Sequence, residues 1–386
     1  MKIEGYIREN GDCGIRNHLL IIPSSVCGYV TARNIANQIN GAIAIANQHG
    51  CCQVKPDMDL VEKTLVGLGC NPNVGAVLVI GLGCDGIQAK DVSDKIKEKT
   101  GKDSRYLVIQ ECGGTLSTMS KGLAIAREMA QKLSVMKKSE FDISKLRLAM
   151  ECGGSDFTSG LISNPIHGKV SDKLISLGGT SMFSETAEII GAEHVMARRA
   201  VNKEDADKLI KMVRDCEEKA KSMGVDFRGS QPTPGNIEGG ISSIEEKSLG
   251  CIHKGGTSPL MGVLDYSEVP SGKGLYIMDT PGQDIESMTG MIAGGCQICI
   301  FTTGRGTPTG FPIAPVIKIT GNYETYNKMS ENIDISAGDV LLGKETLDEA
   351  AERLWNEIIA VCNGKQTKTE ALGHDEFGMY KLTSTF

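Results

Sequence analysis

The chain has 386 residues with a formal net charge of −7, and 40% of its residues are hydrophobic. This length exceeds one small core and predicts two or three domains. The negative charge argues against nucleic acid or an anionic membrane as a partner, because neither attracts an acidic protein. Thirteen cysteines occur without an export signal or an apolar run of membrane length, so we expect reduced thiols or metal ligands in a cytoplasmic protein.

Short runs rich in β-branched residues recur along the chain, and each is followed by a turn rich in glycine or polar residues. Several runs are apolar on both faces, which is typical of parallel strands that helices cover on both sides. The expected strands are, in chain order, 19–23, 42–46, 76–80, 106–109, 146–150, 275–278, 298–301 and 316–319.

Helical periodicity lies between these strands. Asn202 can cap a helix whose apolar stripe ends at Gly224. Thr346 and Glu349 form a capping box before a second stripe, which Gly364 ends. Strands that alternate with helices indicate an α/β protein.

The charged stretch 132–145 is the predicted connection between two domains, one over residues 1–140 and one over residues 141–386. A solvated helix face followed by a loop would have the same composition. The segment 226–240 is rich in proline, glycine and serine and is predicted to be a long loop within the second domain.

Reactive side chains occur where the predicted strands end. Ligands bind outside the carboxyl ends of strands in an open parallel sheet, so these residues are the first candidates for a site. Arg305, which lies among glycines and threonines, suits bidentate binding of a carboxylate, with a structural ion pair as the alternative. The segments are 49–52 with Cys51, 83–85 with Cys84, 152–156 with Cys152 and Asp156, and 302–307 with Thr303.

Other charged residues lie in glycine-rich surroundings. Glu185, Lys247 and Lys254 are candidates, although a solvated surface loop explains each lysine equally well. His167 and His253 are expected to be structural histidines whose hydrogen bonds are satisfied.

These motifs together resemble the catalytic region of the altronate and galactarate dehydratases. The resemblance runs in order over nearly the whole chain. One position departs from it, because the family's His-x-x-Gly-Cys motif has Asn47 in place of the histidine. The similar segments include Gly-Ile-Arg-Asn at 14–17, Gly-Leu-Gly-Cys at 81–84, Cys-Gly-Gly-Ser-Asp at 152–156, Glu-Lys-Ser-Leu-Gly at 246–250 and Thr-Thr-Gly-Arg-Gly at 302–306.

The resemblance implies a lyase that removes water from a sugar acid to give a 2-keto-3-deoxy acid, with Fe²⁺ or Mn²⁺ as cofactor. It implies an α/β fold in which a variant Rossmann-like parallel sheet follows a smaller α/β dimerisation domain. It also implies a homo-oligomer and a separate small β-clip subunit, since full-length members carry such a domain ahead of this region.

Three alternatives stay open at this point. The sulfolactate sulfo-lyase large subunit, a relative of these dehydratases, is similar at 230–240 and 371–377, whereas Cys84 and 302–306 are more similar to the dehydratases. A nicotinamide oxidoreductase should have a Gly-x-Gly-x-x-Gly motif after a strand, followed by an acidic residue about 20 positions later. We do not expect residues 81–86 to be such a dinucleotide-binding motif. The segment 338–344 has the glycine and lysine spacing of a phosphate loop, but Glu345 stands where serine or threonine must reach magnesium, so we reject nucleotide binding there. We therefore expect neither NAD nor a nucleotide as a cofactor. A non-catalytic binding subunit leaves the polar strand ends unexplained.

The implied chemistry assigns roles to the candidate residues. Removal of a proton α to a carboxylate needs electrostatic stabilisation, which a divalent metal can supply, together with a base and an acid. Lys247 is the predicted base, and the predicted residues at the substrate are Arg305, Thr303, Lys254 and Asn236. Asp156 and Glu185 are expected beside the metal as catalytic groups, and together with Cys152 they are the predicted metal ligands. The alternative ligand set is Cys51, Cys84 and Cys152, because soft sulfur suits iron.

Overall fold

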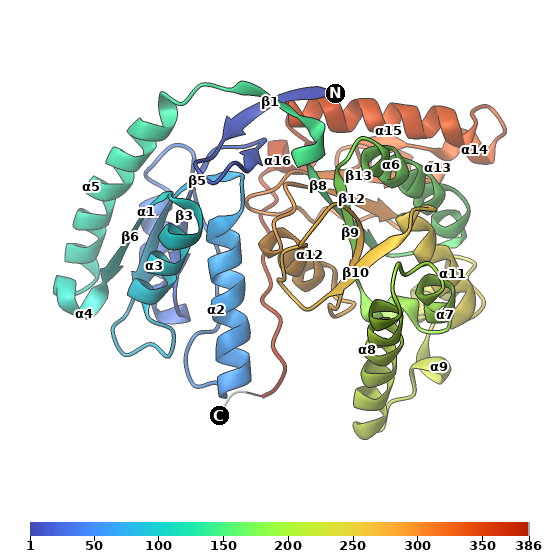
Figure 1. The fold of residues 1–386 in the computed structure, drawn as a ribbon, viewed down its shortest axis with the longest axis horizontal. Coiled ribbons are helices and arrows are strands. Elements are labelled where there is room, and N and C mark those ends of the chain that lie inside the picture. The colour runs from blue at the N-terminus through green and yellow to red at the C-terminus, as the bar shows by residue number, and fades with distance from the viewer. Residues whose placement is uncertain (385–386) are drawn as a thin grey trace.

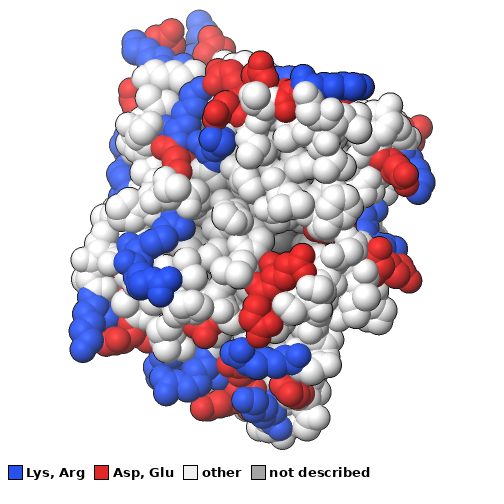
Figure 2. Space-filling model, turned by 90° about the vertical axis from the view of Figure 1, so that its right-hand side faces the viewer, with Lys and Arg blue, Asp and Glu red and all other residues white. Residues whose placement is uncertain are grey.

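The structure, a computed structural model, describes residues 1–384 and contains two parallel sheets and one small antiparallel sheet (Figure 1). We call the parallel sheets the N-terminal sheet and the C-terminal sheet. No helix within the described residues has both the length and the apolar composition that a membrane crossing requires. On the face shown in Figure 2, charged side chains of both signs surround a mostly uncharged centre.

The N-terminal sheet consists, in spatial order, of β4 (Ala42–Ala44), β3 (His18–Pro23), β5 (Val74–Gly81) and β6 (Asp103–Val108), all parallel. Its helices are η1 (Val26–Gly28), α1 (Tyr29–Ala36), α2 (Lys55–Cys70), α3 (Ala89–Thr100), α4 (Ile109–Cys112) and α5 (Thr115–Ser134). Leu19 and Ile21 of β3 pack with α1 and α5, whereas Leu20 and Ile22 pack with α2 and α3. The strand is therefore buried on both faces, as its apolar sequence predicted.

The C-terminal sheet has seven parallel strands in the order β10 (Leu260–Leu264), β11 (Gly274–Met278), β9 (Thr180–Phe183), β8 (Arg147–Gly153), β12 (Ile298–Thr303), β13 (Val316–Thr320) and β14 (Ile335–Ser336). The chain leaves β8 for β9 on one side and later returns to β12 on the other. A crevice for ligands is expected outside the strand ends at such a reversal. The predicted α/β fold, with a Rossmann-like parallel sheet after a smaller α/β unit, is confirmed.

Helices surround the C-terminal sheet (Figure 1). They are η3 (Ser159–Ser163), α6 (Asn164–Ser176), η4 (Thr186–Ile189), α7 (Glu193–Ala197), α8 (Lys203–Ser222), α9 (Phe227–Ser230), α10 (Pro234–Glu238), α11 (Ile244–Ile252), η5 (His253–Gly255), α12 (Asp284–Ala293), α13 (Tyr323–Lys328), α14 (Gly338–Leu341), α15 (Leu347–Cys362) and α16 (Lys368–Leu372).

The segment predicted to connect two domains contains a strand. After α5 ends at Ser134, β7 (Ser139–Asp142) pairs antiparallel with β1 (Lys2–Ile7), which also pairs with β2 (Cys13–Gly14). The turn η2 (Ile143–Lys145) then leads into β8. The predicted boundary at residue 140 lies within β7, where the chain returns to pair with its own N-terminal strand.

All eight predicted strands coincide with strands of the two parallel sheets. The predicted caps are also present: the Asn202 side chain accepts a hydrogen bond from Asp205 N, and Thr346 and Glu349 form the capping box of α15. The patterns missed three strands of the C-terminal sheet, β9, β10 and β14. The first two are short and carry polar residues or glycine among their apolar ones, and β14 has only two residues. The segment 226–240 is not a simple loop, because it holds α9 and α10.

Buried amides join the two parallel sheets. Asn73 Nδ2 donates to the carbonyls of Gln297 at 2.7 Å and Ile313 at 2.9 Å, and Asn73 Oδ1 accepts from Ile15 N at 3.0 Å. Asn71 Nδ2 donates to two further carbonyls near α12, each at 2.8 Å. Residues of α2 and α3 share one apolar core with α12 and the C-terminal sheet, so the two sheets are held by packing and by directed hydrogen bonds.

We expect Asn73→Ala to lower the free energy of unfolding by about 1–3 kcal/mol, because it leaves buried polar groups without partners. Urea denaturation followed by circular dichroism measures this change. Asn10→Ala, which removes an exposed amide paired only with Asp12, is the matched control. An unchanged midpoint for Asn73→Ala would show that these bonds do not hold the sheets together.

Candidate metal and substrate site

Charged and sulfur side chains converge at the carboxyl-terminal edge of the C-terminal sheet. Cys152 lies at the end of β8, and Glu185 and Glu188 lie in the turn after β9. Lys254 is in η5, directly after α11. Because parallel strands end at the same edge of a sheet, residues more than a hundred positions apart meet there.

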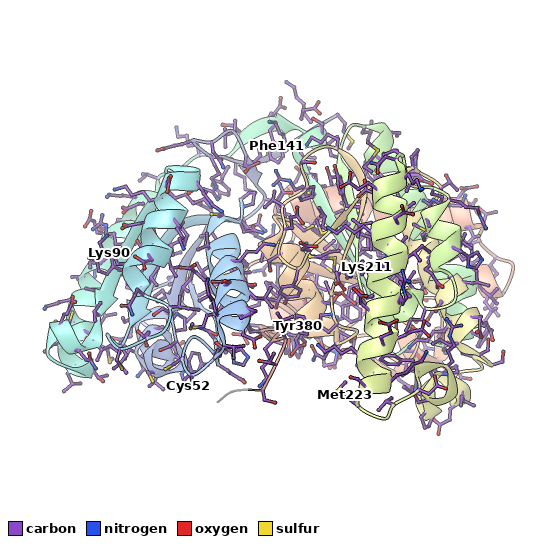
Figure 3. The ribbon with its side chains drawn as sticks, turned by 60° about the horizontal axis from the view of Figure 1, so that its bottom comes forward. Cys52, Lys90, Phe141, Lys211, Met223 and Tyr380 are labelled. Atoms are coloured by element: carbon purple, nitrogen blue, oxygen red, sulfur yellow. The ribbon has the colours of Figure 1, made fainter. Side chains whose placement is uncertain are left out.

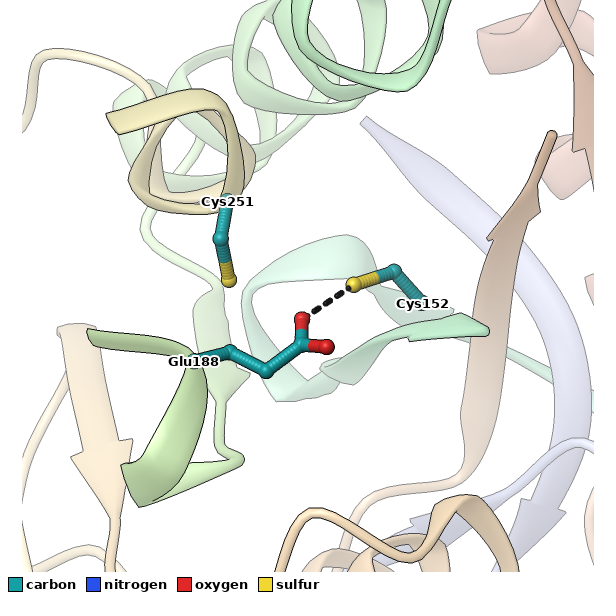
Figure 4. A group of neighbouring side chains, drawn as sticks. All are labelled: Cys152, Glu188 and Cys251. Carbon is teal, nitrogen blue, oxygen red and sulfur yellow. Dashed lines mark hydrogen bonds between the residues drawn. The ribbon is translucent and has the colours of Figure 1, made fainter. Parts of the chain in front are cut away.

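The Cys152 sulfur is the centre of this cluster. Its Sγ lies 2.9 Å from Glu188 Oε2, 3.0 Å from Lys254 Nζ and 3.4 Å from Glu185 Oε2. Figure 4 shows Cys152 and Glu188 facing each other, with the Cys251 sulfur directed toward them from α11. Hydrogen bonding with Cys251 and burial raise the pKa of the Cys152 thiol well above its usual range. The thiol therefore keeps its proton unless a cation displaces it.

Lys254 and Glu185 form a fully buried ion pair. Lys254 Nζ lies 2.8 Å from Glu185 Oε2, and the two side chains are 0% and 1% exposed. Burial alone would lower the pKa of Lys254, but the thiols and carboxylates facing it outweigh burial and hold its pKa well above the ordinary value. Burial and the Glu188 carboxylate raise the pKa of Glu185.

Lys247, the predicted base, is paired with Glu188. Its Nζ lies 3.0 Å from Glu188 Oε1. Burial works against both charges, but the pairing outweighs it, so the pKa of Lys247 is raised and that of Glu188 is lowered to about 2. At neutral pH Lys247 is thus a charged ammonium, which can give up a proton but cannot accept one.

Two groups of three side chains each bring ligand atoms within 4.8 Å of one another. One consists of Cys152, Glu188 and Cys251; the other consists of Glu151, Glu185 and Asp284. Burial, together with the Glu185 and Glu188 carboxylates, raises the pKa of Asp284 to about 7, and burial raises that of Glu151 well above its ordinary value. Acidic groups crowded in this way are characteristic of a site that takes up a cation.

Glu185 has two further signs of a functional position. Its backbone φ is 70°, in the left-handed region that residues other than glycine seldom adopt. Its Oε1 atom is buried and has no hydrogen-bond partner among the described residues. A divalent cation held by Glu151, Glu185 and Asp284 would satisfy that oxygen, and one held by Cys152, Glu188 and Cys251 would offset the excess of carboxylates, so both donor sets fit a metal.

Sequence patterns missed Glu151, Glu188, Cys251 and Asp284. Glu151 had a usable signal, because it is a carboxylate within a strand whose other side chains are apolar from Leu148 to Met150. The sequence analysis assigned no role to Glu188, Cys251 or Asp284, which occur on helical turns where such residues are common.

Asp156, predicted as a metal ligand, is not in either group of three. Its Oδ1 accepts from Thr158 N at 2.9 Å and from Thr158 Oγ1 at 2.6 Å, and its Oδ2 accepts from Asn322 Nδ2 at 2.8 Å. These bonds order the turn that follows β8 and occupy both oxygens. The structure thus places Cys152 and Glu185 together and Asp156 outside their cluster.

The predicted substrate residues other than Lys254 lie around this turn. Asn236 Nδ2 donates to Ser155 O at 2.9 Å, and Thr303 Oγ1 accepts from Gly306 N at 2.9 Å. Arg305 is 45% exposed and donates to Glu238 Oε2 and to Gly235 O, each at 3.1 Å.

Two cavities meet at this turn. One, of about 170 Å³, is lined by Lys247 and Cys251. The other, of about 560 Å³, is lined by Arg305 and Asn322 and lies outside the ends of β8 and β12. Asp156 and Phe157 line both cavities, so the two cavities are neighbours on either side of this turn.

The structure does not bring Cys51 and Cys84 to Cys152. Both follow strands of the N-terminal sheet, whereas every close partner of the Cys152 sulfur belongs to the C-terminal sheet and its connections. His167 also differs from expectation, because it is fully buried and neither ring nitrogen has a partner among the described residues. Burial, together with the Lys254 charge, lowers its pKa to about 3, so the ring is neutral.

The glycine spacing at 81–86 does match a dinucleotide fingerprint, at Gly81, Gly83 and Gly86. In the structure, however, the Asp85 carboxylate accepts from Leu82 N at 2.6 Å and from Gly83 N at 3.3 Å. These amides are therefore not free to bind a phosphate.

Comparison with known proteins identifies the family. Residues 143–385 match the family described as D-galactarate/Altronate dehydratase, C-terminal, and residues 5–134 match D-galactarate dehydratase/Altronate hydrolase, second domain. The chain is 40% identical to the (2R)-sulfolactate sulfo-lyase subunit beta of Chromohalobacter salexigens, over 98% of this chain and 97% of that protein. It is 33% identical to the altronate dehydratase of Bacillus subtilis, over 98% of this chain and 77% of that protein.

A further relative is the galactarate dehydratase (L-threo-forming) of Escherichia coli, which is 35% identical over 84% of this chain and 62% of that protein. The match to both family regions agrees with the resemblance seen in the sequence motifs. The chain therefore belongs to the D-galactarate/altronate dehydratase family and is a lyase.

Proposed function

We propose that this chain is the catalytic subunit of a cytoplasmic, metal-dependent lyase that dehydrates a sugar acid of the altronate or galactarate type. The reaction removes the proton α to the carboxylate and expels the β-hydroxyl, giving a 2-keto-3-deoxy acid. The observation that carries this proposal is the buried cluster of carboxylates, thiols and ammonium groups that adjoins the cavity lined by Lys247 and Cys251.

We assign the metal to Cys152, Glu188 and Cys251, because Cys251 also lines the smaller cavity and can present an ion to a ligand there. Mixed sulfur and oxygen ligands suit Fe²⁺, with Mn²⁺ as the alternative. When bound, such an ion supplies Lewis acidity that stabilises negative charge developing on the substrate carboxylate. Its binding displaces the Cys152 proton and offsets the surplus of carboxylates.

The chain's own groups divide the proton transfers. Glu185, with one oxygen free of hydrogen bonds, is the proposed base for the α-proton. Lys247 faces the smaller cavity as a charged ammonium and is the proposed acid that protonates the departing hydroxyl. This assignment replaces the base role predicted for Lys247, because the Glu188 carboxylate stabilises its charged form.

Arg305 is the proposed clamp for the substrate carboxylate. Its guanidinium now donates to Glu238, a partner that is 69% exposed and that a ligand carboxylate can replace. The planar fork of arginine matches a carboxylate with two parallel hydrogen bonds, and the rest of the sugar acid then extends past Asp156.

A second candidate activity is the elimination of sulfite from sulfolactate. It is favoured by the similarity to a sulfo-lyase subunit beta, which extends over nearly the full length of both chains. That relative is named as one subunit of an enzyme, which supports our proposal that a second polypeptide completes the enzyme. We further propose that this polypeptide is a small subunit of the β-clip type. Homo-oligomerisation through the N-terminal sheet and its helices is part of the same proposal.

Serine or amide substitutions test the metal ligands. We expect Cys152→Ser, Glu188→Gln and Cys251→Ser each to lose about one equivalent of Fe²⁺ and at least about 10-fold in turnover. Iron is quantified after anaerobic purification, and Cys216→Ser on α8 is the control. If only Glu151→Gln and Asp284→Asn lose iron, the ion belongs to the other group. Full iron content in all five variants would remove the metal assignment.

Exchange of Arg305 for lysine tests the clamp. Arg305→Lys keeps the charge but loses the fork, so we expect kcat/KM to fall by about 10- to 100-fold with no change in thermal stability. Arg353→Lys, on a surface arginine paired with Glu345, is the matched control. Equal kinetics for the two variants would exclude Arg305 from substrate binding.

The leaving group is tested by direct assay. With Fe²⁺ under anaerobic conditions, we expect turnover of altronate or galactarate, detected as a 2-keto-3-deoxy acid, and no sulfite release from sulfolactate. Each assay is run with and without the cognate small subunit, because its absence could mask activity. Sulfite release without sugar-acid turnover would assign the chain to the sulfo-lyase activity.

A further inference from the structure

Four cysteines lie together at the carboxyl-terminal edge of the N-terminal sheet. Cys27 is in η1 after β3, Cys51 and Cys52 follow β4, and Cys84 follows β5. The strands β4, β3 and β5 are neighbours in the sheet, so their three loops are adjacent. In Figure 3, Cys52 lies at the end of this sheet that faces away from Phe141 and the antiparallel sheet. The proposed lyase site uses none of these cysteines.

Backbone hydrogen bonds join the three loops to one another. Val26 N donates to His49 O at 3.1 Å, which links the loop with Cys27 to the loop with Cys51 and Cys52. Gly86 N donates to Gly50 O at 2.9 Å, which links that loop to the one with Cys84. The fold therefore holds the three loops that carry the thiols next to one another.

Two buried polar side chains reinforce this arrangement. Asn47 Nδ2 donates to Pro23 O at 3.0 Å, and Asn47 Oδ1 accepts from His49 N at 3.0 Å. Asp85 accepts hydrogen bonds from Leu82 N at 2.6 Å and from the Ser25 hydroxyl. Asp85 thus connects the loop with Cys84 to the loop with Cys27, and Asn47 connects the loop with Cys51 and Cys52 to the end of β3.

The thiols are close and accessible. Cys51 Sγ and Cys52 Sγ are 3.7 Å apart, and Cys27, Cys52 and Cys84 are exposed. A hydrogen bond with Cys51 raises the pKa of Cys52, and the nearby Cys27 and Cys84 raise it further. Thiolates this close together repel one another, and a bound cation would offset that repulsion.

We propose that Cys27, Cys51, Cys52 and Cys84 form a second metal site, which binds a thiophilic divalent ion such as Zn²⁺ or Fe²⁺. In a tetrahedral site with metal–sulfur bonds of about 2.3 Å, two sulfur ligands are about 3.8 Å apart. The distance between Cys51 Sγ and Cys52 Sγ is close to this value. No three of these sulfurs lie within 4.8 Å of one another in the described structure, so binding also requires rotation of the exposed side chains. Each thiol that binds releases one proton to water, and binding weakens as the pH falls.

Co²⁺ is the probe, because thiolate ligation gives it a strong ligand-to-metal charge-transfer absorption. The reduced full-length chain is freed of metal and titrated with Co²⁺, then with Zn²⁺, under anaerobic conditions. We expect a thiolate absorption band that saturates with about one equivalent of Co²⁺ bound at these four cysteines and that Zn²⁺ abolishes. In the Cys152→Ser/Cys251→Ser background, in which the proposed lyase site has lost both thiols, this band should remain. Adding Cys51→Ser/Cys84→Ser to that background should abolish it.

Cys216→Ser is the matched control for loss of a single thiol, and circular dichroism checks that each variant is folded. A band that persists unchanged when Cys51→Ser/Cys84→Ser is added to the Cys152→Ser/Cys251→Ser background would overturn the proposal. A second measurement needs no variant: Zn²⁺ should slow alkylation of Cys27, Cys51, Cys52 and Cys84 in the wild-type chain, mapped by mass spectrometry. Equal alkylation rates with Zn²⁺ and with a chelator would also overturn it.

Discussion

The fully buried ion pair between Lys254 and Glu185 is the interaction on which the rest of the C-terminal site depends. Removing two charges from water costs several kcal/mol per ion, and only close pairing with further hydrogen bonds offsets that cost. Lys254 meets this requirement by contacting both Glu185 Oε2 and Cys152 Sγ. One ammonium thereby joins the end of β8 to the turn after β9. Loss of either partner would leave an unpaired buried charge, so the pair constrains geometry more than it adds stability.

The same constraint explains the acidity pattern around it. Two lysines, Lys247 and Lys254, lie among four carboxylates that are buried or half-buried: Glu151, Glu185, Glu188 and Asp284. Lys247 lowers the pKa of Glu188, whereas burial and neighbouring carboxylates raise the pKa values of Glu151, Glu185 and Asp284. Titratable groups whose pKa values are driven apart are a common property of acid–base catalytic sites.

The two parallel sheets place reactive groups at corresponding edges but in different surroundings. At the C-terminal sheet the groups are mostly buried and of mixed charge, next to two cavities that Asp156 lines. At the N-terminal sheet they are thiols, mostly exposed, on loops that backbone bonds hold together. The difference in burial separates a site suited to proton transfer from one suited to soft metal ions. The shared apolar core and the hydrogen bonds of the Asn71 and Asn73 amides fix the position of one sheet relative to the other.

The sequence alone determined the α/β architecture, the eight principal strands, the caps of α8 and α15 and the family resemblance, because these depend on local periodicity and on short motifs. It also singled out Cys152, Glu185, Lys247 and Lys254, since each lies near a strand end or among glycines. Only the tertiary structure decided that these four form one cluster with Glu151, Glu188, Cys251 and Asp284, while Asp156 orders a turn beside them. It likewise separated Cys152 from Cys51 and Cys84, which the motifs could not distinguish. The physical reason is that strand order and the distribution of charge in a dry interior arise from contacts between distant segments, which no local pattern records.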